Sequence, residues 1–164
     1  MTRRTRISRF FLWLFVTFLS LEAGAGLYET RVLIPLWSAS PPETVRGWDS
    51  TLTVGSRQRF WKFVHPALIF SAVATLVAGW ETPRKHRRWL MASTLASLIV
   101  EVASLAYFVP TLVELLVERG EDLSDEEISR KTNTWIKLNG ARAALGTAGF
   151  LAALRALSTP PSTD

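Results

Sequence analysis

The sequence contains no cysteine and only two histidines. Without cysteine the chain can form no disulfide, no thiolate metal site and no dithiol redox centre. This excludes the four-helix membrane enzymes that use cysteine pairs to pass electrons from disulfides to quinones. The two histidines lie in different surroundings, because His86 belongs to the basic segment RKHRR and His65 to an apolar stretch. A haem held by two axial histidines is therefore not expected.

The sequence also lacks an internal repeat, and its low-complexity content is limited to the short tail STPPSTD at 158–164. Its 164 residues are enough for one domain. We therefore expect a single domain over 1–164, without a second domain to bring a flavin or a nicotinamide.

Apolar residues, by contrast, are abundant: they make up 48% of the chain, and the mean hydropathy is +0.18. A helix needs about 20 residues to cross a bilayer. Four apolar segments reach that length, at 10–28, 61–80, 89–109 and 135–157. The last three begin with tryptophan, which is enriched at membrane interfaces. The pattern predicts an all-α fold, a bundle of four transmembrane helices that forms one integral membrane domain.

The first 25 residues also admit a second interpretation. A basic start, an apolar middle and the AGA at 23–25 resemble a secretory signal peptide. A retained first span is favoured, because Glu22 is an unusual neighbour for a cleavage site.

The net charge of +5 is unevenly placed along the chain. A basic loop at 84–88 joins the second and third spans, and before the first span lie Arg3, Arg4, Arg6 and Arg9. Cytoplasmic loops of membrane proteins carry such an excess of Lys and Arg. We therefore expect a multi-pass protein of the plasma (inner) membrane with both termini in the cytoplasm. Its basic residues should contact the lipid bilayer rather than nucleic acid. The first outer loop departs from the rule with Arg46, Arg57 and Arg59.

Two outer loops of different character are predicted. The first, at 30–60, is long and contains three prolines and two tryptophans in IPLWSASPPETVRGW. The second, at 118–131, is acidic. Its Ser124 precedes Asp-Glu-Glu, which is typical of a helix N-cap with acidic residues in the first turn. A short helix is therefore expected in the second outer loop.

Several ionisable residues fall inside the predicted spans, where they are costly and are functional candidates by default. A rise of about 1.5 Å per residue places three of them at one depth, namely Glu22, Glu101 and Arg142. A second layer nearer the outer surface contains Glu29, His65, Tyr107 and Asn139. Helical spacing gives each span one polar face, which we expect to point into the bundle interior. The alternative is a purely structural ion pair of Arg142 with Glu101 or Glu22.

These residue types suit acid–base chemistry on a lipophilic molecule. Glutamate and histidine are general bases, and arginine and asparagine can donate to a developing oxyanion. The candidate catalytic residues are His65, Glu22, Glu101, Arg142 and Asn139. The candidate substrate-binding residues are Glu29, Trp37, Tyr107 and Trp135.

Two alternatives stay open for a cofactor: none at all, or a non-haem metal ion. A metal would be held by His65, Glu29 and Glu101, a carboxylate-rich set that suits iron or manganese. The sequence has no Glu-x-x-His motif, and a single histidine inside the spans cannot build a two-histidine facial triad.

Four stretches carry a resemblance to a known family: GLYETRVLIPLWSASPPETVRGW, FWKFVHPALIF, YFVPT and TNTWIKLNGARAAL. Together they resemble a family of small four-span membrane proteins, formerly of unknown function, that includes the anthrone oxygenases of polyketide pathways. The likeness extends over about 20–155. It implies as motif positions Glu29, Pro35, Trp37, His65, Pro110, Asn139 and Arg142.

The resemblance implies an oxidoreductase that acts on a lipophilic aromatic or quinone-like molecule. In an anthrone, a base removes a proton from the methylene between two aromatic rings, the carbanion reacts with dioxygen, and the hydroperoxide loses water to leave a quinone. Glu22, Glu101 or His65 would be the base. Arg142 with Asn139 would hold the enolate oxygen, and the aromatic candidates would face the rings. The alternative is a non-catalytic membrane protein that binds a small molecule or an ion, as a transporter component or partner subunit. A homo-oligomer is also left open.

Overall fold

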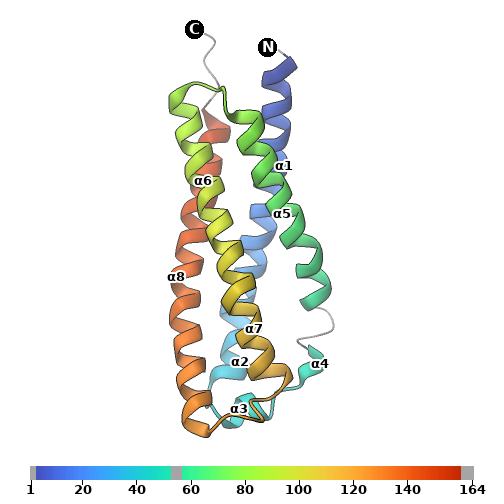
Figure 1. Cartoon of the computed structure of the whole chain (residues 1–164), viewed down its shortest axis with the longest axis vertical. Coiled ribbons are helices and arrows are strands. Elements are labelled where there is room, and N and C mark those ends of the chain that lie inside the picture. The colour runs from blue at the N-terminus through green and yellow to red at the C-terminus, as the bar shows by residue number, and fades with distance from the viewer. Residues whose placement is uncertain (1–2, 53–56, 160–164) are drawn as a thin grey trace. The chain divides into compact units, whose positions relative to one another are not determined.

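The computed structural model describes residues 3–52 and 57–159, and all regular structure in these two ranges is helical (Figure 1). The all-α class is therefore confirmed for the described residues. The long helices are α1 (Arg3–Tyr28), α5 (Gln58–Gly79), α6 (Arg84–Ala103) and α8 (Asp125–Ser158). They contribute to two compact units, which are described separately. Unit 1 comprises Met1–Ala23, Val64–Glu101 and Ala144–Asp164, and unit 2 comprises Gly24–Phe63 and Val102–Ala143.

Three helical runs are long and apolar enough to cross a membrane: Thr5–Ser38, Gln58–Gly79 and Arg84–Val117. Only 22% to 39% of their most apolar windows is buried, so most of these side chains face outward. The exposed large apolar side chains include Phe10, Trp13, Phe70, Val77 and Ile99. Soluble proteins rarely expose so much contiguous apolar surface. The helices therefore indicate a membrane protein.

The fourth predicted span lies within α8, which is not one of these three candidates. The segment 135–157 of α8 is rich in alanine and glycine and carries Lys137, Arg142 and Arg155. These residues make α8 less apolar than the other three runs. The count of four spans is therefore not established by length and composition alone.

Unit 1 is held together by apolar side chains from all four long helices. Its buried core consists of Leu12, Phe15, Val16, Leu19, Leu68, Ala72, Leu90, Ala153 and Ala156. Gly149 on α8 marks a close approach, because a Cβ there would lie only 2.9 Å from the Cβ of Ala96 on α6. Small residues at such positions let membrane helices pack backbone against backbone.

One end of unit 1 gathers the start of α1, the turn between α5 and α6, and the end of α8 (Figure 1). A Cβ on Gly79 would overlap Leu90 and lie 3.7 Å from Oγ of Ser8 on α1. Nδ1 of His86 lies 3.1 Å from the carbonyl oxygen of Thr159, just past α8. The basic residues 84–88, expected in a loop, form the start of α6 and share this end of the unit with the basic start of α1, as a single cytoplasmic face would require.

Unit 2 is built around two tryptophans. Trp37 on α2 (Ile34–Ser38) is 2% exposed and Trp135 on α8 is 1% exposed. Their ring centroids lie 5.4 Å apart at an interplanar angle of 74°. The remaining buried core consists of Ile34, Val45, Phe108, Leu112, Leu115, Leu116 and Ile128. These residues come from α2, α3 (Glu43–Arg46), the π-helical turn η3 (Ser104–Phe108), α7 (Val109–Leu112), the π-helical turn η4 (Val113–Val117) and α8.

Besides Pro66 inside α5, two further prolines lie inside long helical runs without ending them. Pro35 follows the π-helical turn η1 (Glu29–Leu33), and Pro110 follows η3. In each turn a backbone N–H bonds the carbonyl five residues earlier: Ile34 donates to Glu29, and Val109 donates to Ser104. A proline lacks an N–H and its ring clashes with the carbonyl four residues before it. The wider π turn lets the helical path pass these positions.

This path changes the predicted first outer loop. The sequence predicts a loop from residue 30, whereas the helical run extends to Ser38 because the π turn accommodates Pro35. The remaining described part of the loop contains α3 and α4 (Ser50–Leu52).

A capping box begins α8. The N–H of Ser124 donates to Oε2 of Glu127 at 3.0 Å, and the N–H of Glu127 donates to Oγ of Ser124 at 3.3 Å. The predicted cap is therefore present. No proline or glycine interrupts the helix before Gly140, so the expected short helix is the first part of one continuous helix of 34 residues. The turn before it contains Gly120 at φ 60°, where a Cβ would lie 2.8 Å from Ile128.

We predict that Ser124→Ala will fray the first turn of α8, at a cost of roughly 1 kcal/mol. The backbone N–H of Ser124 and, to a lesser extent, its hydroxyl hydrogen-bond the carboxylate of Glu127. These hydrogen bonds hold the pKa of Glu127 below the usual 4.5. Because the pKa is lowered on folding, this stabilisation is complete above pH 4.5 and is lost as the pH falls through the lowered value. Hydrogen exchange of the 125–128 amides should show both effects. Thr134→Ala, on the exposed side of α8, is the control, and equal exchange in the two variants would refute the cap.

Candidate functional site

A buried acid–base pair lies in unit 1. His65 comes from α5 and Glu101 from α6, and Nδ1 of His65 lies 2.7 Å from Oε2 of Glu101. The histidine side chain is 15% exposed and the glutamate side chain 1%. This distance is that of a hydrogen bond, but the angles at the two atoms are not those of a well-formed hydrogen bond. Two residues that the sequence places at neighbouring depths are thus in contact.

The orientation of this pair determines what it can do chemically. A carboxylate that accepts a hydrogen bond from Nδ1–H fixes the ring and its tautomer. Nε2 is then the nitrogen that can take a proton from a bound molecule. This is the arrangement of a histidine general base with an orienting carboxylate.

A second polar centre, in unit 2, surrounds Glu29. This residue is 6% exposed, and both of its carboxylate oxygens are bound. Nε and Nη2 of Arg57 donate to Oε1 and Oε2 at 2.7 Å and 2.8 Å, and Nε1 of Trp61 donates to Oε1 at 2.8 Å. The bidentate geometry is that of a strong charge-assisted pair. Because Glu29 begins η1, the pair ties the π turn to the start of α5.

Arg142 organises a third centre, also in unit 2. Its Nη2 and Nε donate to Oδ1 of Asn139 at 2.8 Å and 3.2 Å, and its Nη1 donates to Oγ of Ser104 at 2.7 Å. The guanidinium carbon lies 4.6 Å from the ring centroid of Phe108, a cation–π contact. Asn139 is 5% exposed and lies one helical turn before Arg142 on α8. The site therefore presents a fixed guanidinium against an aromatic ring.

The aromatic candidates have different surroundings. Nε1 of Trp135 donates to the carbonyl of Phe108 at 3.1 Å, and its ring meets those of Trp37 and Phe108 edge to face. Tyr107 is half-buried, and its ring centroid lies 5.2 Å from that of Phe108. The two tryptophans are thus core residues of unit 2, and Tyr107 keeps part of its surface accessible.

Glu22 is half-buried on α1, in unit 1. Its expected partner Arg142 belongs to unit 2, so the pairing of Glu22 or Glu101 with Arg142 stays a prediction. For Glu29, depth and proximity in the sequence suggest a pairing with His65, Asn139, Arg31 or Arg46. The structure shows instead that its carboxylate binds Arg57 and Trp61.

Sequence reasoning missed Arg57, Trp61 and Ser104 as functional partners. A signal for Arg57 was available, because an arginine in an outer loop breaks the positive-inside rule and so needs a local reason. Trp61 fits an interfacial tryptophan equally well, and a serine in a membrane helix is too common to single out. Only the folded geometry distinguishes these residues.

The metal hypothesis requires three ligands in one place. Among the residues that the structure describes, no group of three or more His, Asp or Glu side chains is arranged to hold a metal ion. His65 and Glu101 form a pair, while Glu29 is bound to Arg57 in the other unit. The expected set of His65, Glu29 and Glu101 is therefore not shown as one cluster.

A family model described as anthrone oxygenase matches residues 57–152. The chain belongs to the anthrone oxygenase family. The matched segment includes His65, Glu101, Asn139 and Arg142 and begins after Glu22 and Glu29. No curated protein and no solved structure shows a significant match. The family resemblance expected from the sequence is thus confirmed.

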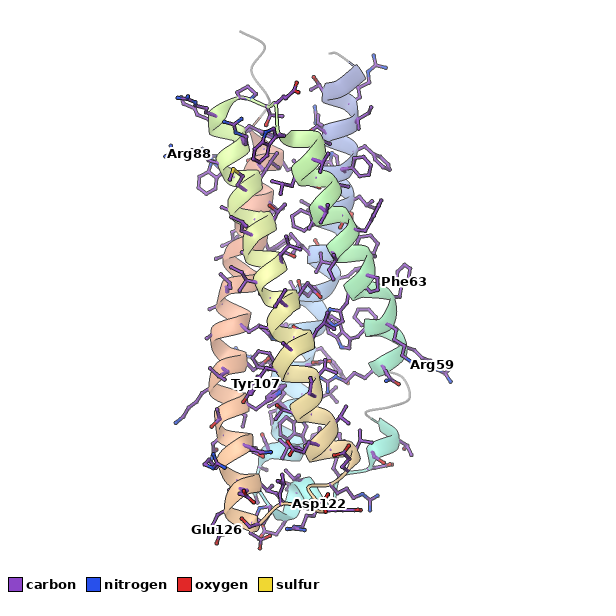
Figure 2. The ribbon with its side chains drawn as sticks, viewed as in Figure 1. Arg59, Phe63, Arg88, Tyr107, Asp122 and Glu126 are labelled. Carbon is purple, nitrogen blue, oxygen red and sulfur yellow. The ribbon has the colours of Figure 1, made fainter. Side chains whose placement is uncertain are left out.

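We predict that Arg57→Ala will destabilise the anthrone oxygenase family member strongly, because it leaves the Glu29 carboxylate buried without its cation. The expected loss is roughly 2–4 kcal/mol, less than for a fully buried pair because the Arg57 side chain keeps some exposure. Thermal unfolding in detergent will measure it. The matched control is Arg59→Ala, since Arg59 is exposed and points away from the helices (Figure 2).

A double variant makes the Glu29–Arg57 test specific. Glu29→Gln should restore part of the stability lost in Arg57→Ala, because an amide costs less to bury than an unpaired carboxylate. Additive losses in the double variant would show that the two side chains do not interact.

Proposed function

We propose that this chain is a membrane-bound oxygenase of the anthrone type, which oxidises a lipophilic aromatic carbon acid with dioxygen. The observation that supports the proposal best is the contact of 2.7 Å between His65 and Glu101, inside the segment that matches the family. A buried base is what the first step of such a reaction needs. The apolar outward surfaces of the helices fit a substrate that dissolves in the bilayer.

The proposed reaction balances without another reductant. The base removes one proton from the methylene that lies between two aromatic rings and opposite a ketone, and the negative charge spreads onto the ketone oxygen. The carbanion reacts with dioxygen to form a hydroperoxide. Loss of water then leaves a second ketone, so the methylene carbon loses two hydrogens and gains one oxygen atom, and the other oxygen atom leaves as water.

His65 is the base in this proposal. Its Nε2 takes the proton, while Glu101 accepts from Nδ1 and stabilises the imidazolium that forms. The proton then returns to the peroxide as water is lost, so the pair ends each cycle as it began. Glu22 is the other carboxylate of unit 1 that remains a candidate base.

Arg142 and Asn139 are proposed as donors to the oxyanion. Two neutral oxygens, of Asn139 and Ser104, orient the guanidinium, so its position is set by the chain before a substrate arrives. Tyr107 is the aromatic candidate with accessible surface to offer a substrate ring. Trp37 and Trp135 support it from within the unit 2 core, and Glu29 has a supporting role through Arg57.

Oxygen uptake with an added anthrone tests the proposal. We expect His65→Gln to lower kcat/KM by about 10²- to 10⁴-fold, the usual value of a general base. Glu101→Gln should lower it less, because an amide oxygen can still accept from Nδ1–H. Glu118→Gln, an exposed carboxylate elsewhere in the chain, is the control. In the same assay Arg142→Lys should lower kcat more than it raises KM, since it removes the forked donor geometry.

Two results would reject this function. The first is oxygen uptake that is unchanged in His65→Gln. The second is an absence of oxygen uptake in the folded wild-type protein although it binds the anthrone, measured by quenching of tryptophan fluorescence. The second result would favour a non-catalytic binding protein.

We also propose that α8 supplies a fourth span and that both termini face the cytoplasm across the inner membrane. Its support is the joint position of the basic start of α1 and the basic start of α6 at one end of unit 1. The absence of cysteine makes the test direct, because each introduced cysteine is unique. A membrane-impermeant maleimide applied to whole cells should label Glu121→Cys, and should label Lys85→Cys and Arg155→Cys only after lysis. Labelling of Arg155→Cys in intact cells would rule out the fourth span.

A further inference from the structure

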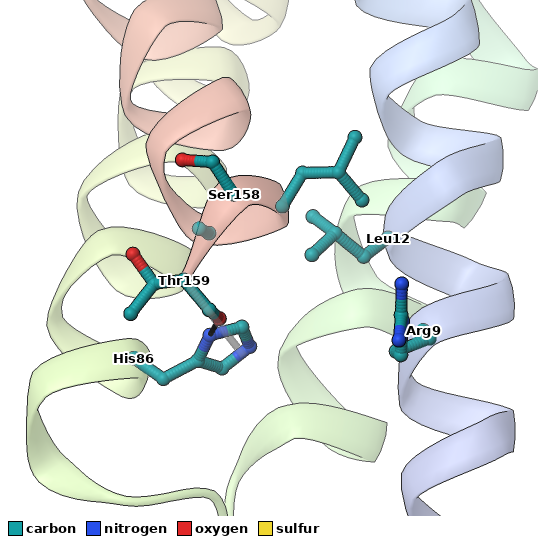
Figure 3. Close-up of a pocket in the computed structure, with 7 residues that line it drawn as sticks. Arg9, Leu12, His86, Ser158 and Thr159 are labelled. Carbon is teal, nitrogen blue, oxygen red and sulfur yellow. Dashed lines mark hydrogen bonds between the residues drawn. The ribbon is translucent and has the colours of Figure 1, made fainter. Parts of the chain in front are cut away.

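A pocket opens at the basic end of unit 1, between α1, α6 and the end of α8. Its volume is about 200 Å³, and Figure 3 shows His86 and Arg9 on opposite sides of it. The apolar part of its lining consists of Leu12, Ala156 and Leu157. Glu101 lies 15 residues further along α6 than His86, about 22 Å at the rise of an α-helix. The pocket is therefore separate from the proposed base.

His86 is a buried polar residue with one defined hydrogen bond. It is 4% exposed, and its Nδ1 lies 3.1 Å from the carbonyl oxygen of Thr159. A carbonyl oxygen only accepts, so Nδ1 must carry the hydrogen. The tautomer is thereby fixed, and Nε2 is the ring nitrogen left for a ligand. An anion next to Nε2 would favour the doubly protonated ring, whose Nε2–H donates to it.

The end of α8 does not present bare carbonyls to the pocket. The hydroxyls of Ser158 and Thr159 both donate to the carbonyl of Arg155, at 3.1 Å and 2.8 Å. The N–H of Thr159 donates to Ala156 at 3.3 Å, and His86 donates to Thr159 itself. These donors offset the partial negative charge of a helix C-terminus. An anion in the pocket is therefore less strongly opposed by the helix.

Arg9 supplies the permanent positive charge. Its side chain is exposed, and no carboxylate of the described residues forms an ion pair with it. A guanidinium offers a planar fork of donors that matches a phosphate in bidentate fashion. The same end of unit 1 also carries exposed Arg6, Arg84, Lys85 and Arg88.

We propose that this pocket binds a phosphate group between Arg9 and His86. In a membrane the abundant carrier of that group is the phosphodiester of a phospholipid, whose glycerol backbone would lie against Leu12, Ala156 and Leu157. A soluble phosphate has the same chemistry at the charged end and lacks the apolar part. The site would fasten the start of α1 and the end of α8 to the headgroup layer, independently of any reaction at His65.

Native mass spectrometry of the full chain, released from uncharged detergent, tests the proposal. The protein is titrated with phosphatidylglycerol, with diacylglycerol, and with inorganic phosphate at constant ionic strength. We expect one phosphatidylglycerol to be retained, and diacylglycerol not to be. Arg9→Gln should weaken that binding about tenfold or more, as expected for loss of a charge-assisted contact. Arg6→Gln is the matched control, because Arg6 is exposed on the same helix and does not line the pocket.

The outcomes separate the sources of phosphate. Binding of phosphatidylglycerol alone assigns the pocket to a lipid headgroup, and equal binding of inorganic phosphate, sensitive to Arg9→Gln, assigns it to a soluble phosphate. Equal losses in Arg9→Gln and Arg6→Gln would overturn the proposal, because they would show a diffuse basic surface. Retention of diacylglycerol as strong as that of phosphatidylglycerol would overturn it as well.

Discussion

The cost of removing a charged group from water shapes this protein more than any other constraint. In apolar helices a carboxylate needs a partner that donates to it, because neither lipid nor a packed core can do so. Glu29 meets this requirement with Arg57 and Trp61, and the carboxylate of Glu101 lies 2.7 Å from Nδ1 of His65. In both cases the partner comes from α5 or from the residue just before it. The polar centres therefore also fix how the helices pack within each unit.

The π turns serve the same requirement through the backbone. A proline in a membrane helix releases a carbonyl that has no water to bond. Here the turns η1 and η3 precede Pro35 and Pro110, and each begins with a polar residue that takes part in a site, Glu29 in one and Ser104 in the other. π turns are frequent at functional positions because they change the direction of side chains along a helix. The prolines of the family motif thus have a physical reason to lie beside the polar residues.

The fold was largely accessible from the sequence, because apolar length and the cap at Ser124 are local signals. Local signals could not show that the first helix continues past Pro35. It continues through a π turn, whose backbone hydrogen bonds to the carbonyl five residues earlier cannot be predicted from composition. The site was accessible in part. Depth counting brought His65 and Glu101 to neighbouring levels, and the structure places them in contact. Depth counting could not identify Arg57, because it places only residues inside a helix, and Arg57 lies in the predicted loop. The fourth span in α8 stays a prediction because α8 is less apolar than the other three runs, and the pairing of Glu22 with Arg142 stays one because the two residues belong to different units.

The length of the first helical run has a consequence for the surrounding lipid. Thr5–Ser38 contains 34 residues, which amounts to about 51 Å of helix, whereas the hydrocarbon layer is about 30 Å thick. A run this much longer than the layer must tilt or project into water at one end. Glu29, Pro35 and Trp37 all lie in its last third, where a projecting end would emerge. If the run projects at that end, the polar centre around Glu29 lies at the level of the headgroups, where the dielectric changes steeply. A thicker or thinner bilayer would then alter how much of this centre is hydrated, and membrane thickness would be a variable to which this end of the protein responds.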